Sequence, residues 1–142
     1  MAHAQARKIR DVMSKNVVTL AASSSPRDAA RAMREHDIGA VVVERNRKVC
    51  GIVTDRDLVV RGLADERGLD RELGSFCSQN LVCLGPEQDV GEAVQLMKEK
   101  AVRRIPVVDD GRTVGIVSIG DLAQHRDPQS ALGTISSAPP NH

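Results

Sequence analysis

The sequence contains no tryptophan and no tyrosine, and its one phenylalanine is Phe76. Its interior must therefore be built from aliphatic side chains, and a planar ligand would be held by such side chains and by the backbone. Three cysteines, Cys50, Cys77 and Cys83, are odd in number and lack the spacing of metal ligands. Cys50 and Cys83 lie inside apolar runs, so we interpret them as small buried hydrophobic residues.

The sequence also has no marked excess of positive or negative charge. Twenty Lys and Arg against 19 Asp and Glu give a formal net charge of +1, which offers no field for nucleic acid or for an anionic membrane. No stretch is long and apolar enough to span a bilayer, and the N-terminus lacks the apolar segment of a signal peptide. We therefore expect a cytoplasmic protein with no nucleic-acid partner and no membrane partner.

What the chain does have is an internal duplication. Shifted by 64 residues, residues 11–58 align with residues 75–122 without a gap. The segment 51–58 (GIVTDRDL) returns as 115–122 (GIVSIGDL). Two copies of one supersecondary unit predict a pseudo-twofold molecule in which a site carried by the unit occurs twice.

Each copy predicts the order strand, helix, strand, strand, helix, and the fold class is α/β. The first strands are expected at 17–20 and 81–84, and the helices after them begin behind the N-cap residues Ser25 and Asp89. Apolar runs at 40–43 and 49–53, and at 105–108 and 114–117, predict two hairpins. A second helix then begins at Asp55 or Ile119. We expect a flexible arm over 1–8, repeat 1 over 9–64, a linker over 65–74, repeat 2 over 75–125 and a flexible tail over 126–142.

A hydroxyl and a carboxylate recur where the third strand of each copy becomes a helix. Thr54 is followed by Asp57, and Ser118 by Asp121. A helix start offers free backbone N–H groups to an anion, the hydroxyl can donate to a phosphate, and the carboxylate can accept from ribose hydroxyls. The same residues also fit a capping box that serves only the helix. Both interpretations stay open, because a cap hydroxyl can serve the helix while the site is empty.

Two arginines, Arg103 and Arg104, precede the middle strand of the second copy. A guanidinium at this place can pair bidentately with a phosphate. The alternative is a solvated pair at a corner between helix and strand. The matching residues of the first copy, Gly39 and Ala40, carry no charge, so repeat 2 is expected to be the main phosphate donor.

The duplication, the order of elements and the repeated GIV[T/S]xxDL segment resemble tandem cystathionine-β-synthase (CBS) domains, also called a Bateman module. Residues 34–40 and 54–64 resemble in particular the stand-alone CBS pairs of the actinobacterial hypoxic response protein type. The resemblance implies two repeats packed through their sheets, clefts that bind AMP, ADP, ATP or S-adenosylmethionine, and assembly into a homodimer. It implies these ligand-binding residues: Asp57 and Asp121 for the ribose; Thr54, Ser118, Arg103 and Arg104 for phosphate; Val17, Val18, Leu81 and Val82 for the base.

From these observations we expect a non-catalytic sensor that binds an adenosine nucleotide, AMP first among them, between the repeats. It would signal through an unidentified effector protein or a change of oligomer, and it would need no cofactor and no metal. No histidine has a spacing that suggests a catalytic partner. The alternative is a dimerising scaffold or stress-response interaction protein whose nucleotide pocket is empty or vestigial.

Overall fold

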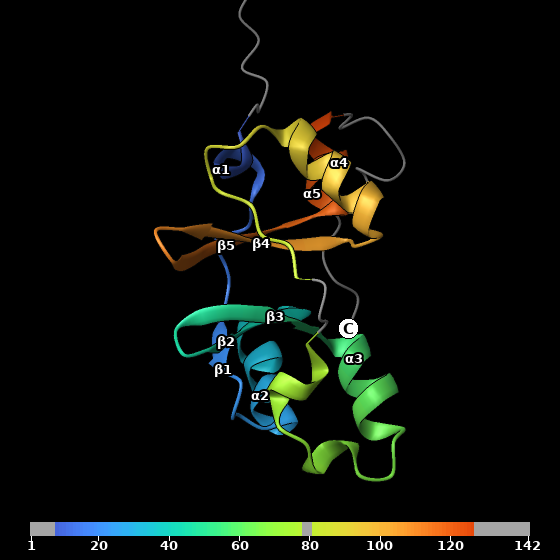
Figure 1. Ribbon diagram of the computed structural model, residues 1–142. Coiled ribbons are helices and arrows are strands. Elements are labelled where there is room, and N and C mark those ends of the chain that lie inside the picture. The colour runs from blue at the N-terminus through green and yellow to red at the C-terminus, as the bar shows by residue number, and fades with distance from the viewer. Residues whose placement is uncertain (1–7, 78–80, 127–142) are drawn as a thin grey trace, which may run out of the picture. The chain divides into compact units, whose positions relative to one another are not determined.

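The computed structural model describes residues 8–77 and 81–126 (Figure 1). The arm expected at 1–8 and the tail expected at 126–142 lie outside the described residues, except for residues 8 and 126. The described chain divides into two units. The repeat-1 unit contains residues 16–77, 81 and 109–114, and the repeat-2 unit contains residues 8–15, 82–108 and 115–126. Within the described ranges, no helix combines the length and apolarity needed to cross a membrane.

The repeat-1 unit is built on a three-stranded sheet ordered β1-β2-β3. Strand β1 (Thr19–Ala21) is parallel to β2 (Ala40–Arg45), and β3 (Lys48–Thr54) is antiparallel to β2. Helix α2 (Pro26–His36) makes the crossover that a parallel pair requires. It packs against the sheet through Ala29, Ala32 and Met33 (Figure 1).

Four short helical segments complete this unit. Helix α3 (Asp55–Asp57) continues directly into the π-helix η1 (Leu58–Leu63). Two 3₁₀ turns follow, η2 (Gly68–Asp70) and η3 (Leu73–Phe76). Leu73 and Phe76 are buried in the same core as α2, so the segment expected to be a linker closes the repeat-1 core at its C-terminal end.

The repeat-2 unit is built around the hairpin of β4 (Arg104–Asp109) and β5 (Arg112–Ser118), without its residues 109–114, which belong to the repeat-1 unit. Three helices lie over one face of it: α1 (Ile9–Val12), α4 (Val90–Lys100) and α5 (Ile119–Arg126) (Figure 1). The strand predicted at 81–84 is wrong in extent. Within the described residues, only Leu84 pairs there, in a single parallel bridge to Val107.

The helical turn at the start of each copy packs in the opposite unit: the turn of copy 1 belongs to the repeat-2 unit, and the turn of copy 2 belongs to the repeat-1 unit. Ile9 is fully buried in the repeat-2 unit, and its counterpart Leu73 is fully buried in the repeat-1 unit. The residues after α1 continue this pairing, since Ser14 and Ile116 exchange backbone hydrogen bonds of 2.8 and 3.0 Å. The duplicated sequence therefore yields two units that each contain a segment of both copies.

The repeated glycine of the GIV segment permits this crossing in both units. A Cβ on Gly115 would lie 2.7 Å from Met13 Sδ and 2.8 Å from the carbonyl oxygen of Ser14. A Cβ on Gly51 would lie 2.7 Å from the Cβ of Cys77. Met13 and Cys77 are equivalent positions of the two copies, so each glycine is required by the close approach of one crossing segment.

Local signals set both hairpin turns, and they set the start of α2 as predicted. Both hairpins turn through two residues with positive φ, Asn46 and Arg47 (54° and 65°) and Asp110 and Gly111 (51° and 78°), which is the geometry of a type I′ turn.

At α2, the Ser25 hydroxyl accepts from the Asp28 amide and the Asp28 carboxylate accepts from the Ser25 amide, each at 3.0 Å. These bonds hold the pKa of Asp28 below its ordinary value. The matching prediction at Asp89 is only partly right. This residue is the N-cap of α4, but its side chain makes no capping bond. The neighbouring Gln88 side chain instead accepts from the Gly85 amide and donates to Glu92.

Candidate functional site

The repeated hydroxyl and carboxylate form a capping box in both units. The amide of Asp57 donates to Thr54 Oγ1 at 3.1 Å, and the amide of Thr54 donates to Asp57 Oδ2 at 2.8 Å. The amide of Asp121 donates to Ser118 Oγ at 3.1 Å, and the amide of Ser118 donates to Asp121 Oδ2 at 2.9 Å. Each helix start is thereby satisfied by its own side chains.

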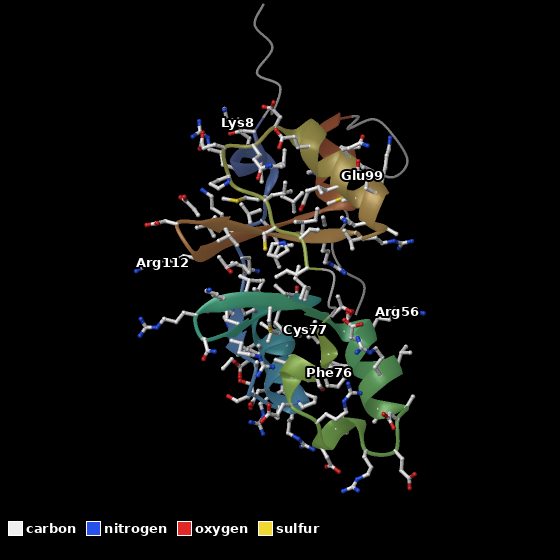
Figure 2. All side chains as sticks on the ribbon, viewed as in Figure 1. Lys8, Arg56, Phe76, Cys77, Glu99 and Arg112 are labelled. Carbon is white, nitrogen blue, oxygen red and sulfur yellow. The ribbon has the colours of Figure 1, made fainter. Side chains whose placement is uncertain are left out.

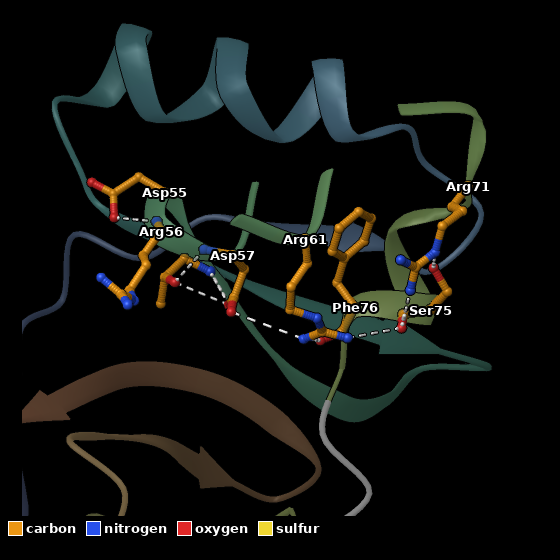
Figure 3. A network of polar contacts seen from close by, with 8 residues as sticks. Asp55, Arg56, Asp57, Arg61, Arg71, Ser75 and Phe76 are labelled. Atoms are coloured by element: carbon orange, nitrogen blue, oxygen red, sulfur yellow. Dashed lines mark hydrogen bonds and ion pairs between the residues drawn. The ribbon is translucent and has the colours of Figure 1, made fainter. Parts of the chain in front are cut away.

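The second carboxylate oxygen differs between the two boxes. Asp57 Oδ1 lies 3.9 Å from Nη1 of Arg61, one helical turn further on (Figure 3). Within residues 8–77 and 81–126, Asp121 Oδ1 has no hydrogen bond and no ion pair. The carboxylate of the repeat-2 unit therefore keeps one oxygen available as an acceptor, while that of the repeat-1 unit faces a cation of its own chain.

A cavity of about 340 Å³ opens beside the capping box of the repeat-2 unit. It is lined by Arg103, Arg104, Ser118, Ile119, Gly120, Asp121 and Gln124. All four residues that the sequence assigned to ligand binding in this part of repeat 2 lie around this one cavity. Gln124 was not predicted, and its position one helical turn after Asp121 is the only signal that would have identified it.

The cavity carries a net positive set of side chains. Within the described part of the chain, the guanidinium groups of Arg103 and Arg104 have no carboxylate partner and both residues are exposed. The carbonyl of Arg103 accepts from the Ile119 amide at 2.9 Å, which ties the arginine pair to the start of α5. Two guanidinium groups, a hydroxyl and a carboxylate acceptor at one helix N-terminus can together bind an anion that also carries hydroxyl groups.

The repeat-1 unit offers a different set at the equivalent place. The Gly39 carbonyl accepts from the Asp55 amide at 3.0 Å, so the backbone connection is conserved between the copies. No cation stands at the positions of Arg103 and Arg104, because these are Gly39 and Ala40.

The residues predicted to hold the base do not line the cavity beside Asp121. Val17 and Val18 are half-buried in the repeat-1 unit, and Val18 packs on its core. Leu81 is 38% exposed, and Val82 is half-buried. Their role at a ligand stays a prediction.

The cysteines depart from the predicted pattern. Cys83 is exposed, so its interpretation as a buried residue is wrong; the strand that would have enclosed it is only a single bridge at Leu84. Cys50 and Cys77 are half-buried and neighbours in space, with their sulfur atoms 3.4 Å apart. Among the residues placed by the structure, no three His, Cys, Asp or Glu side chains gather as a metal site would require.

A comparison with protein families decides which fold family these units represent. The CBS domain model matches twice, over residues 9–63 and 73–127. The chain belongs to the CBS domain family. Both matches begin at the crossing turns, Ile9 and Leu73, so the CBS repeat includes the segment that packs in the other unit.

Several relatives of this CBS pair are matched over most of their own length. Hypoxic response protein 1 of Mycobacterium tuberculosis is 36% identical over 127 residues, covering 87% of each chain. CBS domain-containing protein YhcV of Bacillus subtilis is 32% identical over 126 residues, covering 89% of this chain and 90% of YhcV. A crystal structure of hypoxic response protein I with two coordinated zinc ions has a TM-score of 0.72 at 33% identity, and covers 83% of this chain and 98% of the other.

One solved CBS pair was crystallised with ligands. It is a domain pair in complex with 5′-methylthioadenosine and S-adenosyl-L-methionine, with a TM-score of 0.74 at 24% identity, and it covers 87% of this chain and 98% of that chain. At this identity the likeness establishes the shared fold.

Proposed function

We propose that this CBS pair is a non-catalytic regulatory protein that senses an adenosine nucleotide, AMP first among the candidates. One observation carries the proposal. Arg103, Arg104, Ser118 and Asp121 surround a single cavity at the start of α5. This set provides cations for a phosphate and an acceptor for ribose hydroxyls in one place.

The two units would contribute unequally. Asp121 keeps Oδ1 available and stands beside two arginines, whereas Asp57 faces Arg61 and has no arginine pair. The repeat-2 unit is therefore the primary site in this proposal, and Thr54 and Asp57 form a weaker one. The proposal is supported by a CBS pair of the same fold that was solved in complex with two adenosine-containing ligands.

The output of the sensor would be a change in association. A ligand can shift an equilibrium only through different affinity for the two states. We place the protein in the cytoplasm, with an effector protein or a second copy of the chain as its partner, and we assign it no catalytic residue, cofactor or metal.

A homodimer is the association we propose first. Val59, Val60 and Leu63 of η1 are 57%, 51% and 67% exposed, and exposed apolar clusters of this kind mark interaction surfaces. Sedimentation equilibrium is expected to give a dimer for the wild-type chain and a monomer for Val60→Lys/Leu63→Glu with unchanged circular dichroism. A monomeric wild-type chain would remove the dimer from the proposal.

The ligand is tested by a thermal-shift series with adenosine, AMP, ADP, ATP and S-adenosylmethionine. A ligand at about a hundred times its dissociation constant adds roughly 2.7 kcal/mol of stability, a rise of several degrees in Tm for a chain of this size. We expect a rise with AMP that falls to about half or less in Asp121→Asn, since asparagine keeps the capping acceptor but removes the charge. Asp57→Asn is the matched control, and it should retain most of the rise.

The scaffold alternative rests on the capping boxes. Both hydroxyl and carboxylate pairs are satisfied by their own helix starts, as they would be in a protein that binds no nucleotide. Absence of any thermal shift across the series would favour this alternative and direct the search to protein partners.

A further inference from the structure

Two thiols meet in the repeat-1 unit, whereas the cavity of Arg103 and Asp121 belongs to the repeat-2 unit. Cys50 lies on β3, and Cys77 directly follows η3. Their sulfur atoms are 3.4 Å apart and share a hydrogen bond. Both residues are half-buried, so neither is sealed from a small solute. The third cysteine, Cys83, belongs to the other unit.

The contact is built by the chain around it. A Cβ on Gly51 would lie 3.3 Å from the Cα of Cys77 and 2.9 Å from its sulfur, so the missing side chain at 51 lets residue 77 approach β3. The Cys77 amide donates to the Gly74 carbonyl at 3.2 Å, which holds the residue at the end of the 3₁₀ turn. At the positions equivalent by the 64-residue shift, the chain has Val114 for Cys50 and Met13 for Cys77, so the fold itself does not require the thiol pair.

We propose that Cys50 and Cys77 form a reversible intramolecular disulfide when a small-molecule disulfide, such as oxidised glutathione, accumulates. The sulfur atoms must approach by roughly 1.4 Å to reach the ~2.0 Å of a covalent bond. In the first step a Cys50 thiolate attacks the small disulfide, leaving a mixed disulfide and one free small thiol. In the second step Cys77 attacks the Cys50 sulfur and releases the second small thiol. The two protein thiols are oxidised, and the small disulfide is reduced to two thiols.

The surroundings of Cys77 favour this order. Burial, followed by the hydrogen bond with Cys50 and the charge of that group, raises the pKa of Cys77 to about 12, so Cys77 is a thiol at neutral pH and does not attack first. The hydrogen bond and the charge of Cys50 disappear once Cys50 is in the mixed disulfide. Burial then remains, opposed by the positive charges of Arg45 and Arg61, which lower the pKa of Cys77. The second thiol therefore becomes more reactive after the first has reacted.

The bond would act on the neighbouring polar network. The carbonyl of Phe76, the residue before Cys77, accepts from Arg61 Nη1 at 2.8 Å, and the same Nη1 lies 3.9 Å from Asp57 Oδ1 (Figure 3). Figure 2 shows Phe76 and Cys77 together beside β3. A shift of Cys77 toward Cys50 thus moves the acceptor that positions Arg61. We therefore expect oxidation to change the position of the Arg61 guanidinium relative to Asp57. Only the meaning of this change for ligand binding rests on the proposed nucleotide function.

The test uses the full chain, free of nucleotide, equilibrated with mixtures of reduced and oxidised glutathione. The samples are quenched with acid, alkylated and mapped by mass spectrometry. We expect a peptide pair joined through Cys50 and Cys77, an alkylated Cys83, and reversal by excess reduced glutathione. The cross-link closes a loop between residues 27 positions apart, so Tm should rise by about 5–10 °C on oxidation. Cys83→Ser is the matched control and should behave as the wild type, whereas Cys50→Ser and Cys77→Ser should show neither the cross-link nor the shift.

Three results would overturn the proposal: three alkylated thiols in excess oxidised glutathione, a cross-link that involves Cys83 or a second chain, or glutathione that stays attached to Cys50. Measuring AMP binding to oxidised and to reduced Cys83→Ser distinguishes a failure of the proposed nucleotide function from a failure of the disulfide proposal. A disulfide that forms without any AMP binding would leave the thiol pair standing and count against the sensor function only.

Discussion

Replacing Phe76 by alanine is expected to lower the free energy of unfolding by about 3–5 kcal/mol, the loss typical of a buried aromatic side chain. Phe76 is the only aromatic residue of the chain and is 1% exposed. Its ring lies between two guanidinium groups, 5.6 Å from Arg61 and 4.6 Å from Arg71 (Figure 3). The ring also lies next to Gly62, where a Cβ would stand at an ordinary contact distance of 3.6 Å from two ring carbons.

The measurement is urea unfolding followed by far-ultraviolet circular dichroism, because a chain without tryptophan and tyrosine gives little intrinsic fluorescence. Phe76→Leu is the matched variant. It keeps most of the apolar volume and removes the ring, so a loss of about 1–1.5 kcal/mol is expected. Val12→Ala, at the equivalent position of the other unit, removes fewer atoms and should cost less than Phe76→Ala. A cost below about 1 kcal/mol for Phe76→Ala would contradict the packing described for this residue.

Replacing Arg103 and Arg104 together by glutamine is expected to weaken AMP binding by about 10- to 100-fold and to leave adenosine binding unchanged. Each charge-assisted hydrogen bond to a phosphate contributes about 1.5–3 kcal/mol, and the exposure of both side chains reduces that contribution. Both guanidinium groups line the cavity next to Asp121. Since adenosine has no phosphate, its affinity should depend on Asp121 alone among these residues.

The matched control removes the same charge elsewhere. Arg27 and Arg31 line a separate surface cavity on α2 of the repeat-1 unit, so Arg27→Gln/Arg31→Gln tests for a mere effect of net charge. This control should leave the affinity for AMP within about twofold of the wild type, as screened surface charges do. An equal loss of AMP affinity in both double variants, or an equal loss for AMP and adenosine, would show that the arginine pair does not contact the phosphate.

The sequence predicts features that depend on local signals. The capping box at Ser25, the two hairpins and the order of elements each follow from residues close together in the chain. The duplication also predicts the CBS fold, which the family match at 9–63 and 73–127 confirms. The resemblance to CBS pairs assigned Arg103, Arg104, Ser118 and Asp121 to one kind of ligand, and the structure places these four residues around one cavity.

The features that the sequence does not predict are set by tertiary contacts. Nothing near Ile9 or Leu73 indicates that each turn packs in the unit of the other copy, since the contact partners lie far away in the chain. The strand expected at 81–84 shortens to one bridge at Leu84, because a short apolar run pairs only as far as its neighbour allows. The meeting of Cys50 with Cys77 depends on Gly51, whose role appears only once residue 77 is placed beside it.

A calorimetric titration of the wild-type chain and of Asp121→Asn with AMP tests whether the repeat-2 unit binds an adenosine nucleotide. We expect saturable binding to the wild type and a dissociation constant at least about tenfold higher for Asp121→Asn, the loss expected when a charged acceptor becomes neutral. Asp121→Asn must retain its circular dichroism spectrum, because the asparagine oxygen still caps α5. The absence of AMP binding to the wild type, or equal affinity of the two proteins, would contradict the account.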